Sequence, residues 1–407
     1  MHSSHSESVP SGQSFTALAG PCAPERLPVA RTSPAGAIGN YRIRELTTPA
    51  GIDAIRELWD DLVARVAHQS FLHELPWSAA VCGQLLPGIV CYYCVYDGET
   101  LIAVIPLERR SWGLGFLKLR WLQLPTHSNI FLGDILLDQA YHRESVFSAV
   151  LDHIDRVSSF HWDYCKLRKF CPRSSLYSLA RQEGMMTRQV GNCSYTSCRD
   201  GADAGRISRK MWKNVSRLSR KAAREIGPVN MDCSEPGPAC EGSFRDFLDI
   251  ESSGWKGESG SGTSLSADPR SSDFFRSLMV DSAQEWFARV FTLKFGAHKV
   301  ASMLAIKSNS IWYLLKIGYD EEYRAYGPGS ILLQAFIERV VAEEDTAEIN
   351  LTTAPLWAER WHFPSVPLYE SLVFGSTLRA RACRIYYGLK FRLRQREAGP
   401  GGVLAHC

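Results

Sequence analysis

Residues 312–334 read Trp312-Tyr-Leu-Leu-Lys-Ile-Gly-Tyr-Asp-Glu-Glu-Tyr-Arg-Ala-Tyr-Gly-Pro-Gly-Ser-Ile-Leu-Leu-Gln334. An apolar strand pattern runs into a polar loop and then into a helix, whose start is marked by Gly327-Pro-Gly329. Glycines let the backbone approach a ligand closely, so we expect free N–H groups of Gly329, Ser330 and Ile331 to face an anion at the positive end of the helix macrodipole. The stretch predicts a phosphate-binding turn, although a Gly/Pro turn that only caps a helix has the same spacing.

Alternating apolar residues and a Gly-bearing turn predict further strands around this stretch. A turn at 296–299 is expected to join two of them as a hairpin, and the strand at 311–317 is expected to be followed by a helix and a further strand. The elements predicted for the second half are strands at 288–295, 300–306, 311–317 and 348–352 and a helix at 330–342.

The first half shows a similar order of elements. Segment 96–103 aligns with segment 295–302 as a hairpin that leads into a strand, which indicates a duplicated unit, while two unrelated mixed-sheet domains would also share this order. The class predicted is α+β, as tandem domains that each hold a mixed, mostly antiparallel sheet flanked by helices. The elements predicted for the first half are strands at 41–46, 89–96, 101–107, 117–124 and 162–169 and helices at 52–63, 76–85, 141–157 and 174–183.

The composition fits a soluble globular protein. Of 407 residues, 45% are hydrophobic and 22% charged, and the net charge of +3 is too near balance to identify a polyanion or a membrane as the partner. No run of about 18 apolar residues occurs, and residues 1–40 lack the pattern of a secretory signal, so we expect a cytoplasmic protein. Cys91 and Cys94 lack a second ligand pair, which favours reduced thiols and predicts no metal site.

Changes in composition divide the chain. A basic helix at 209–224 and a Pro-containing linker at 227–242 separate the halves. The predicted parts are a disordered leader at 1–40, a first domain at 41–200, the basic helix and linker at 201–242, a second domain at 243–390 and a flexible tail at 391–407.

Three motifs occur in a fixed order along the second half. They are Glu251-Ser-Ser-Gly-Trp-Lys-Gly257, the turn Gly318-Tyr-Asp-Glu-Glu-Tyr323 and the helix start Pro328-Gly329, with Trp357-Ala-Glu-Arg-Trp361 further downstream. In this order they resemble the acetyltransferase family related to cellulose-biosynthesis and exopolysaccharide proteins, a branch of the GNAT superfamily of N-acetyltransferases. The resemblance covers roughly residues 60–365.

The resemblance implies tandem GNAT-like domains and a donor that is acetyl-coenzyme A or a longer acyl-coenzyme A. It implies that the pyrophosphate of the donor lies on the turn at 324–330 and that its pantetheine lies along the strand at 311–317. In the first half the equivalent region has the single glycine Gly133, so that domain is predicted to shape the acceptor pocket. The expected donor-binding residues are Lys316, Ile317, Arg324, Gly327, Gly329 and Ser330, and Trp255 and Lys256 are expected to bind the acceptor.

Acyl transfer to an amine needs a base for the amine and an acid for the departing thiolate. Glu251 is the candidate base, although a helix-end carboxylate also suits a solvated surface or a pair with Lys256. Asp320 is a second candidate, while Asp also caps such turns by bonding its own backbone. Tyr369, in a run that resembles the superfamily's Y-E-x-L-G-F element, is the candidate acid, although Val373 stands where glycine is usual.

Two further residues enter the search for a base. His362 is an alternative, although a histidine among aromatic residues is more often packed. Asn350 stands where the family element has an acidic residue, which argues against a carboxylate from that strand.

The basic helix has an apolar stripe, so it suits a solvated face on a packed helix or a surface that binds a charged acceptor, anionic lipid or tRNA. The function predicted is an acyl-CoA-dependent N-acyltransferase acting on an amine of a sugar, lipid or other cell-envelope or polysaccharide precursor. An amine on a lipid is among the expected acceptors, since segment 381–394 is aromatic and basic. Peripheral membrane contact is a separate expectation for the partners. The alternatives are an aminoacyl-tRNA-dependent transferase of the peptidoglycan-bridge type and a non-catalytic scaffold in polysaccharide synthesis.

Overall fold

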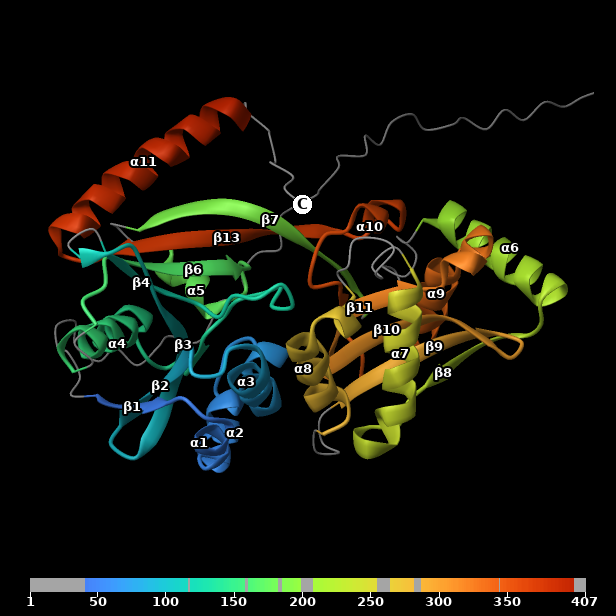
Figure 1. Ribbon diagram of the computed structural model, residues 1–407, viewed down its shortest axis with the longest axis horizontal. Coiled ribbons are helices and arrows are strands. Elements are labelled where there is room, and N and C mark those ends of the chain that lie inside the picture. The colour runs from blue at the N-terminus through green and yellow to red at the C-terminus, as the bar shows by residue number, and fades with distance from the viewer. Residues whose placement is uncertain are drawn as a thin grey trace, which may run out of the picture.

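The computed structural model describes residues 41–115, 118–157, 160–181, 185–198, 208–254, 264–281, 287–343 and 345–398 (Figure 1). The predicted leader at 1–40 and the two expected acceptor-binding residues, Trp255 and Lys256, lie outside these ranges.

The first half of the chain alternates hairpins with short helices, as its sequence pattern predicts. The helix predicted at 76–85 begins at Leu75 as α3 and ends as a π-helical turn at Val81–Leu85. The elements are β1 Arg42–Leu46, α1 Pro49–Asp53, α2 Arg56–Ala64, α3 Leu75–Ala80, β2 Val90–Asp97, β3 Thr100–Trp112, β4 Leu119–Gln123, β5 Leu136–Leu137, α4 Arg143–Arg156, β6 Tyr164–Phe170, α5 Ser175–Leu179 and β7 Met186–Ser197.

The second half contains the basic helix, α6, and every strand and helix predicted for it. The expected linker at 227–242 contains an edge strand, β8, and residues 391–398 of the expected flexible tail continue the last helix, α11. The elements are α6 Arg209–Glu225, β8 Val229–Cys233, α7 Glu241–Ser253, α8 Pro269–Met279, β9 Phe287–Phe295, β10 His298–Ser308, β11 Ile311–Tyr319, the 3-10 helix Glu321–Tyr326, α9 Pro328–Val341, β12 Glu348–Asn350, α10 Leu356–Arg360, β13 Ser365–Phe374 and α11 Leu378–Ala398.

The described strands form one 13-stranded sheet. Counted inward from either edge, the strands of each half follow one another in the same order. The order along the sheet is β1-β2-β3-β4-β6-β13-β7-β12-β11-β10-β9-β8, and the short strand β5 pairs with β3 beside this path. β1 to β4 and β6 therefore correspond to β8 to β11 and β12. Each half has one parallel pair, β4 with β6 and β11 with β12, and a helix, α4 or α9, connects the strands of each pair. The α+β class and the repeated plan are therefore confirmed.

The two halves exchange their last strands. β7 follows β6 in the chain but pairs with β12, and β13 follows β12 but pairs with β6 (Figure 1). The predicted domain boundaries at 200 and 243 stay predictions, and strand pairing crosses both. Neither exchanged strand was expected from the sequence, because Gly191 interrupts the pattern of β7 and Pro367 lies within β13.

Helices cover both faces of the sheet. In the second half, α7 and α8 pack on one face through Phe247 and Phe274, and α6 and α9 pack on the other through Val215 and Phe336. One buried cluster joins the halves, because α3 and its neighbours pack against α8 and β11. Its closest aromatic contacts across the joint are Phe71 with Tyr313, at 4.6 Å between ring centroids, and Trp77 with Phe274, at 5.1 Å.

Candidate active site

The parallel strands β11 and β12 separate soon after they pair. Their register covers three residues of β11, from Ile311 to Tyr313, while β11 continues to Tyr319. After Asn350 the chain turns away at Thr352, which has a left-handed φ of 58° and whose hydroxyl donates to the Leu314 carbonyl at 3.0 Å. The second part of β11 therefore has an edge that β12 does not cover.

The turn between β11 and α9 is held by capping bonds. Asp320 accepts a hydrogen bond from the Glu322 N–H at 3.0 Å and so caps the 3-10 helix Glu321–Tyr326, which is the structural role weighed for it above. Gly327 then has a left-handed φ of 65°, a conformation that glycine adopts without a steric cost. Pro328 begins α9, where its missing N–H removes no helical bond.

Two of the three N–H groups expected to be free at the start of α9 are hydrogen-bonded within the chain. Those of Ser330 and Ile331 both donate to the Gly327 carbonyl, at 3.0 and 3.1 Å. Among the described residues, the Gly329 N–H has no such partner. The predicted set of three free donors is therefore wrong for two of them, because the helix closes its first turn on Gly327, and Gly329 is the donor that remains.

Glu251 ends α7 beside this turn and is 2% exposed. Its Oε2 accepts the Leu265 N–H at 2.9 Å. The backbone of Gly318 passes so close that a Cβ there would lie 3.1 Å from the Glu251 Cα, and a Cβ on Gly254 would lie 3.2 Å from the Tyr319 carbonyl oxygen. The separate motifs at 251–257 and 318–323 thus describe one close contact between the end of α7 and the end of β11.

A cavity of about 500 Å³ lies where these elements meet. It contains Glu251 and a floor from β11 and α9, and α6 and α10 add apolar walls. Of the expected site residues, the cavity is lined by Glu251, Ile317, Arg324, Gly327, Gly329 and Ser330.

The cavity also reveals residues to which sequence reasoning gave no role. Arg360 and Trp361 line it from α10 and its end, and Met211 lines it from α6. The signal was present in the motif at 357–361, which the resemblance includes without a role for its arginine. Arg324 and Arg360 are both exposed, and no ion pair joins either guanidinium to a carboxylate of the described residues. The cavity therefore combines two cations and a helix start, which suits an anionic ligand.

Lys316 is not brought to this cavity. Successive side chains of a strand point to opposite faces, so Ile317 lines the cavity and Lys316 points to the other side. There its ammonium lies 5.6 Å from the ring centroid of Phe131 and 5.8 Å from that of Phe275. Its expected contact with the donor does not fit this placement.

The structure places Tyr369 in the first half's core, apart from the cavity. It lies on the exchanged strand β13, 5.3 Å from Tyr177 and 6.2 Å from Phe170 between ring centroids, and burial raises its pKa. The strand exchange explains this position, because β13 follows the second domain in the chain but pairs with β6. A role as the acid at this cavity does not fit the geometry.

The two remaining candidates also lie outside the cavity lining. His362 is exposed, with a left-handed φ of 61°, where packing was expected. Asn350 accepts the Thr352 N–H at 2.9 Å and donates to Glu348 at 3.2 Å, so its side chain shapes the turn at which the strands separate.

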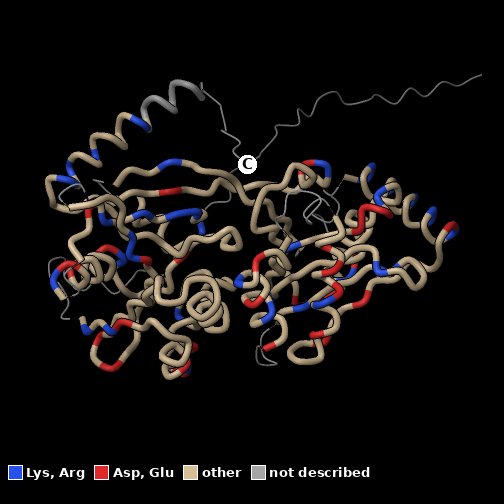
Figure 2. Tube along the Cα trace, viewed as in Figure 1, with Lys and Arg blue, Asp and Glu red and all other residues tan. Residues whose placement is uncertain are grey.

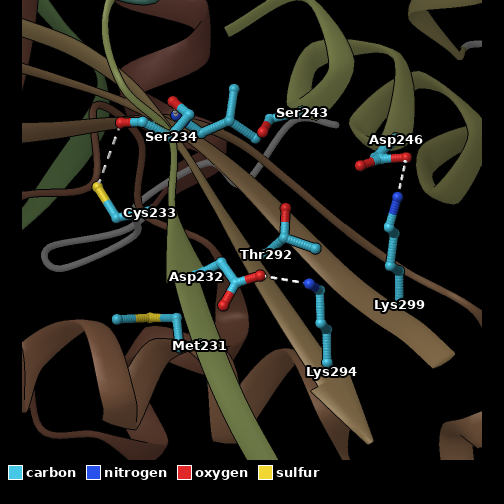
Figure 3. Close-up of a pocket in the computed structure, with 10 residues that line it drawn as sticks. Met231, Asp232, Cys233, Ser234, Ser243, Asp246, Thr292, Lys294 and Lys299 are labelled. Atoms are coloured by element: carbon cyan, nitrogen blue, oxygen red, sulfur yellow. Dashed lines mark hydrogen bonds and ion pairs between the residues drawn. The ribbon is translucent and has the colours of Figure 1, made fainter. Parts of the chain in front are cut away.

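A second cavity, of about 550 Å³, lies on the other side of β9 and β10, between β8 and α7 (Figure 3). Its charges neutralise one another, because Lys294 pairs with Asp232 and Lys299 lies 2.6 Å from Asp246. The Cys233 thiol donates to the Ser234 carbonyl, and burial raises its pKa. A cavity with paired charges and a protonated thiol is a poorer candidate for catalysis than the first cavity. No cluster of three or more metal-ligating side chains occurs among the described residues.

Residues 209–360 match a family model described as the acetyltransferase (GNAT) domain. Over these residues the chain is similar to GNAT acetyltransferase domains. The match contains all of the residues that line the cavity except Trp361, and it supports an acyltransferase, as predicted. The exopolysaccharide branch of the superfamily stays a prediction. No curated protein matches the chain significantly.

Solved structures share the whole tandem fold at low identity. FemX is 12% identical, with 85% of this chain and 99% of FemX covered and a TM-score of 0.56. L-PGS from Bacillus licheniformis is 14% identical, with 83% and 96% covered and a TM-score of 0.51. A tandem GNAT protein from the clavulanic acid biosynthesis pathway is 11% identical, with 83% and 99% covered and a TM-score of 0.47.

Proposed function

We propose that the protein is an acyl-coenzyme A-dependent N-acyltransferase whose donor binds in the cavity at the start of α9. The observation that carries the proposal is the convergence of the Gly329 N–H, two exposed arginines and a buried carboxylate on one cavity beside the uncovered edge of β11. Gly329, Arg324 and Arg360 are the residues that would hold the phosphates of the donor, because an N-terminal helix turn and guanidinium groups both favour anions. The bound donor supplies an acyl group activated as a thioester.

Glu251 is the proposed base. It lines the cavity, and its carboxylate accepts the Leu265 N–H, so it is positioned to accept a proton from an attacking amine. In the reaction the new bond joins the amine nitrogen to the acyl carbon, the carbon–sulfur bond breaks, and the thiolate takes up a proton. No residue outside the cavity is needed for the first proton transfer.

The proposed acceptor is an amine of a sugar, a lipid or another precursor of the cell envelope or of a polysaccharide. We propose that the first half shapes the acceptor side, because it packs against β11 through Phe71 and because Phe131 lies beside Lys316 on the opposite face of that strand. Trp255 and Lys256 remain proposed contacts of the acceptor.

Transfer of an aminoacyl group from tRNA is the second candidate function. The observation that favours it is α6, a helix with a dense row of cations that also forms a wall of the cavity through Met211 (Figure 2). A polyanion on α6 would place its end near the cavity. A scaffold without activity is less consistent with a buried carboxylate in a cavity with unpaired cations.

The deciding experiment titrates the protein with coenzyme A, acetyl-coenzyme A and palmitoyl-coenzyme A by calorimetry and by thermal unfolding. A ligand at a hundred times its dissociation constant stabilises the native state by about 2.7 kcal/mol, so binding raises Tm measurably. The three ligands also report the acyl length that the cavity accepts.

Two matched variants locate the binding. Gly329 and Gly242 both lie in the first turn of a helix, and a Cβ at Gly329 would lie 3.5 Å from Tyr319, while a Cβ at Gly242 would meet nothing within 4 Å. Gly329→Glu places a carboxylate in the cavity and should weaken donor binding at least about a hundredfold, since like charge opposes the phosphates. Gly242→Glu should bind as the wild type does. If none of the three ligands binds the wild type, the proposal fails, and transfer from charged tRNA should then be assayed.

A further inference from the structure

The last helix, α11, stands along the outside of the sheet (Figure 1). It runs from Leu378 to Ala398 and contains six arginines, one lysine and one glutamate. Figure 2 shows basic residues along the described part of its length. No helix of the described residues is long and apolar enough to cross a membrane, and the charges of α11 show why this one is not.

One face of α11 packs on the protein. Its inner residues recur at helical spacing. They are Cys383, Tyr387 and Phe391, and they pack in one cluster with Tyr164 of β6 and Leu372 of β13. The Tyr387 and Tyr164 rings lie 5.5 Å apart, and the Arg188 guanidinium lies 4.8 Å from the Phe391 ring. This face of α11 is therefore packed on the sheet, and the opposite face points away from it.

The outward face carries aliphatic side chains that no other described residue covers. Leu378 is 81% exposed, Ile385 66% and Leu389 56%, and on a regular helix these three lie within about 40° of one another. Tyr386, 57% exposed, lies beside them. Arg381 and Arg384 are exposed on one flank of this stripe, and Lys390 lies on the other flank, near the Tyr386 ring. The outer stripe is thus a row of aliphatic residues with two arginines on one flank and one lysine on the other.

This combination selects one partner. A second copy would bring two strongly basic helices together, and their like charges oppose pairing. A nucleic acid would pair with the arginines but would leave the aliphatic row without a partner. A bilayer with anionic lipids satisfies both, because acyl chains accept the aliphatic residues and lipid phosphates accept the cations.

We propose that α11 docks the protein on an anionic membrane surface, with the stripe Leu378, Ile385 and Leu389 in the headgroup layer and the flanking cations on lipid phosphates. The helix lies in the plane of the surface, since its inner face stays packed on β13. α10, which borders the candidate active site, lies along the same upper edge in Figure 1 and exposes Leu356 by 84%. Docking through α11 does not depend on the proposed reaction.

The test uses the full chain with vesicles of phosphatidylcholine alone and vesicles of phosphatidylcholine with phosphatidylglycerol, and flotation gives the bound fraction. We expect binding to the anionic vesicles only, weakened by high salt. Ile385→Asp with Leu389→Asp should lower the partition coefficient about a hundredfold, because it removes aliphatic area and adds like charge. Arg381→Glu with Arg384→Glu should lower it about as much. All four side chains are exposed, so circular dichroism and Tm should stay unchanged.

A matched charge reversal on the other basic helix is the control. Arg217→Glu with Arg220→Glu on α6 changes the net charge equally and should leave the partition coefficient unchanged. An equal loss in this variant, or wild-type binding by the Asp variant, would overturn the proposal. Absence of binding to the anionic vesicles would also overturn it. In that case tRNA binding that needs Arg381 and Arg384 would identify a nucleic acid as the partner, and a dimer in sedimentation velocity that needs Ile385 and Leu389 would identify a second copy.

Discussion

The two halves of the molecule share one plan but end their parallel strand pair differently. In the first half β4 ends at Gln123, which is also its last residue paired with β6, and the Leu124 N–H still bonds the Lys166 carbonyl at 3.1 Å. The following chain then packs on β6, where the Gly133 N–H donates to the Lys169 carbonyl at 3.1 Å. In the second half β11 runs on beyond Tyr313, the last residue that it pairs with β12, and a cavity lies beside the part that β12 does not cover.

The helices after these strands differ in the same sense. α4 begins at Arg143 after an extended His142, with no glycine in its first turn, whereas α9 begins after the left-handed Gly327. The fold alone therefore does not make a site. A cavity is present where one strand of the parallel pair continues beyond its partner and where the start of the next helix leaves room for a ligand. The first half is thus closed, because its parallel strands stay covered, and the second half is open, because part of β11 is not covered by β12.

The largest effect is expected at Glu251. Each half buries a carboxylate, Glu251 at 2% exposure beside the cavity and Glu108 at 0% in the first half, where Thr126, Gln123 and Arg110 donate to it. Glu251→Gln should lower kcat about a thousandfold, because a general base is lost, and should leave donor binding in place.

Glu108→Gln is the matched control for this prediction. It weakens the ion pair with Arg110 and should lower the free energy of unfolding, while kcat of the folded protein stays unchanged. Steady-state kinetics with calorimetric binding separates the two effects. Equal loss of kcat in both variants would show that Glu251 has a structural role only.

The glycines of the two halves should respond oppositely to alanine. A Cβ on Gly133 would lie 2.2 Å from the Arg168 carbonyl oxygen, so Gly133→Ala should lower the free energy of unfolding by about 3 kcal/mol. At Gly329 the nearest atom is 3.5 Å away, so Gly329→Ala should leave the stability unchanged or raise it slightly. Urea unfolding measures both. A similar loss at Gly329 would mean that the start of α9 is closed by packing as the first half is.

The exchanged strands hold the halves together partly by charge. Glu370 of β13 is 3% exposed and lies 3.0 Å from Lys166 and 2.9 Å from Arg188, both in the first half of the chain. Burial opposes ionisation, but these cations outweigh it and hold the pKa of Glu370 below its usual 4.5. The folded state then binds a proton less readily than the unfolded state, so the stabilisation is complete above the unfolded-state pKa of about 4.5 and is lost as pH falls through the folded pKa.

Glu370→Gln should cost about 2 kcal/mol at neutral pH, and the difference from the wild type should shrink as the medium becomes acidic. Urea unfolding over a pH series measures the difference. Glu99→Gln, at a side chain 98% exposed, should show neither effect. A difference that stays constant with pH would contradict the ionic role of Glu370.

The sequence predicted the local elements and six of the residues that line the candidate cavity, because the patterns that point to them are local. The strand–turn–helix pattern at 312–334 gave Gly327 and Gly329 their places, and the motif glycines Gly254 and Gly318 lie where α7 and β11 nearly touch. It failed where position depends on distant pairing. Tyr369 lies apart from the cavity because β13 crosses into the first half. Lys316 is a different case, because a local rule, the alternation of side chains along β11, turns it away from the face that Ile317 lines.

Arg360 is the missed residue with a direct consequence. It reaches the cavity from α10 only because the tertiary fold brings α10 beside α9, so its spacing from Arg324 in the sequence carried no information. Arg360→Ala should weaken donor binding about tenfold, as expected for one exposed charge-assisted contact, and the effect should shrink at high salt. Arg56→Ala, which removes a cation already paired with Asp53 in the first half, should leave binding unchanged. Calorimetric titration at two salt concentrations measures both. An unchanged affinity in Arg360→Ala would limit the anion site to the helix start and Arg324, and would narrow the difference between the halves to the glycine turn alone.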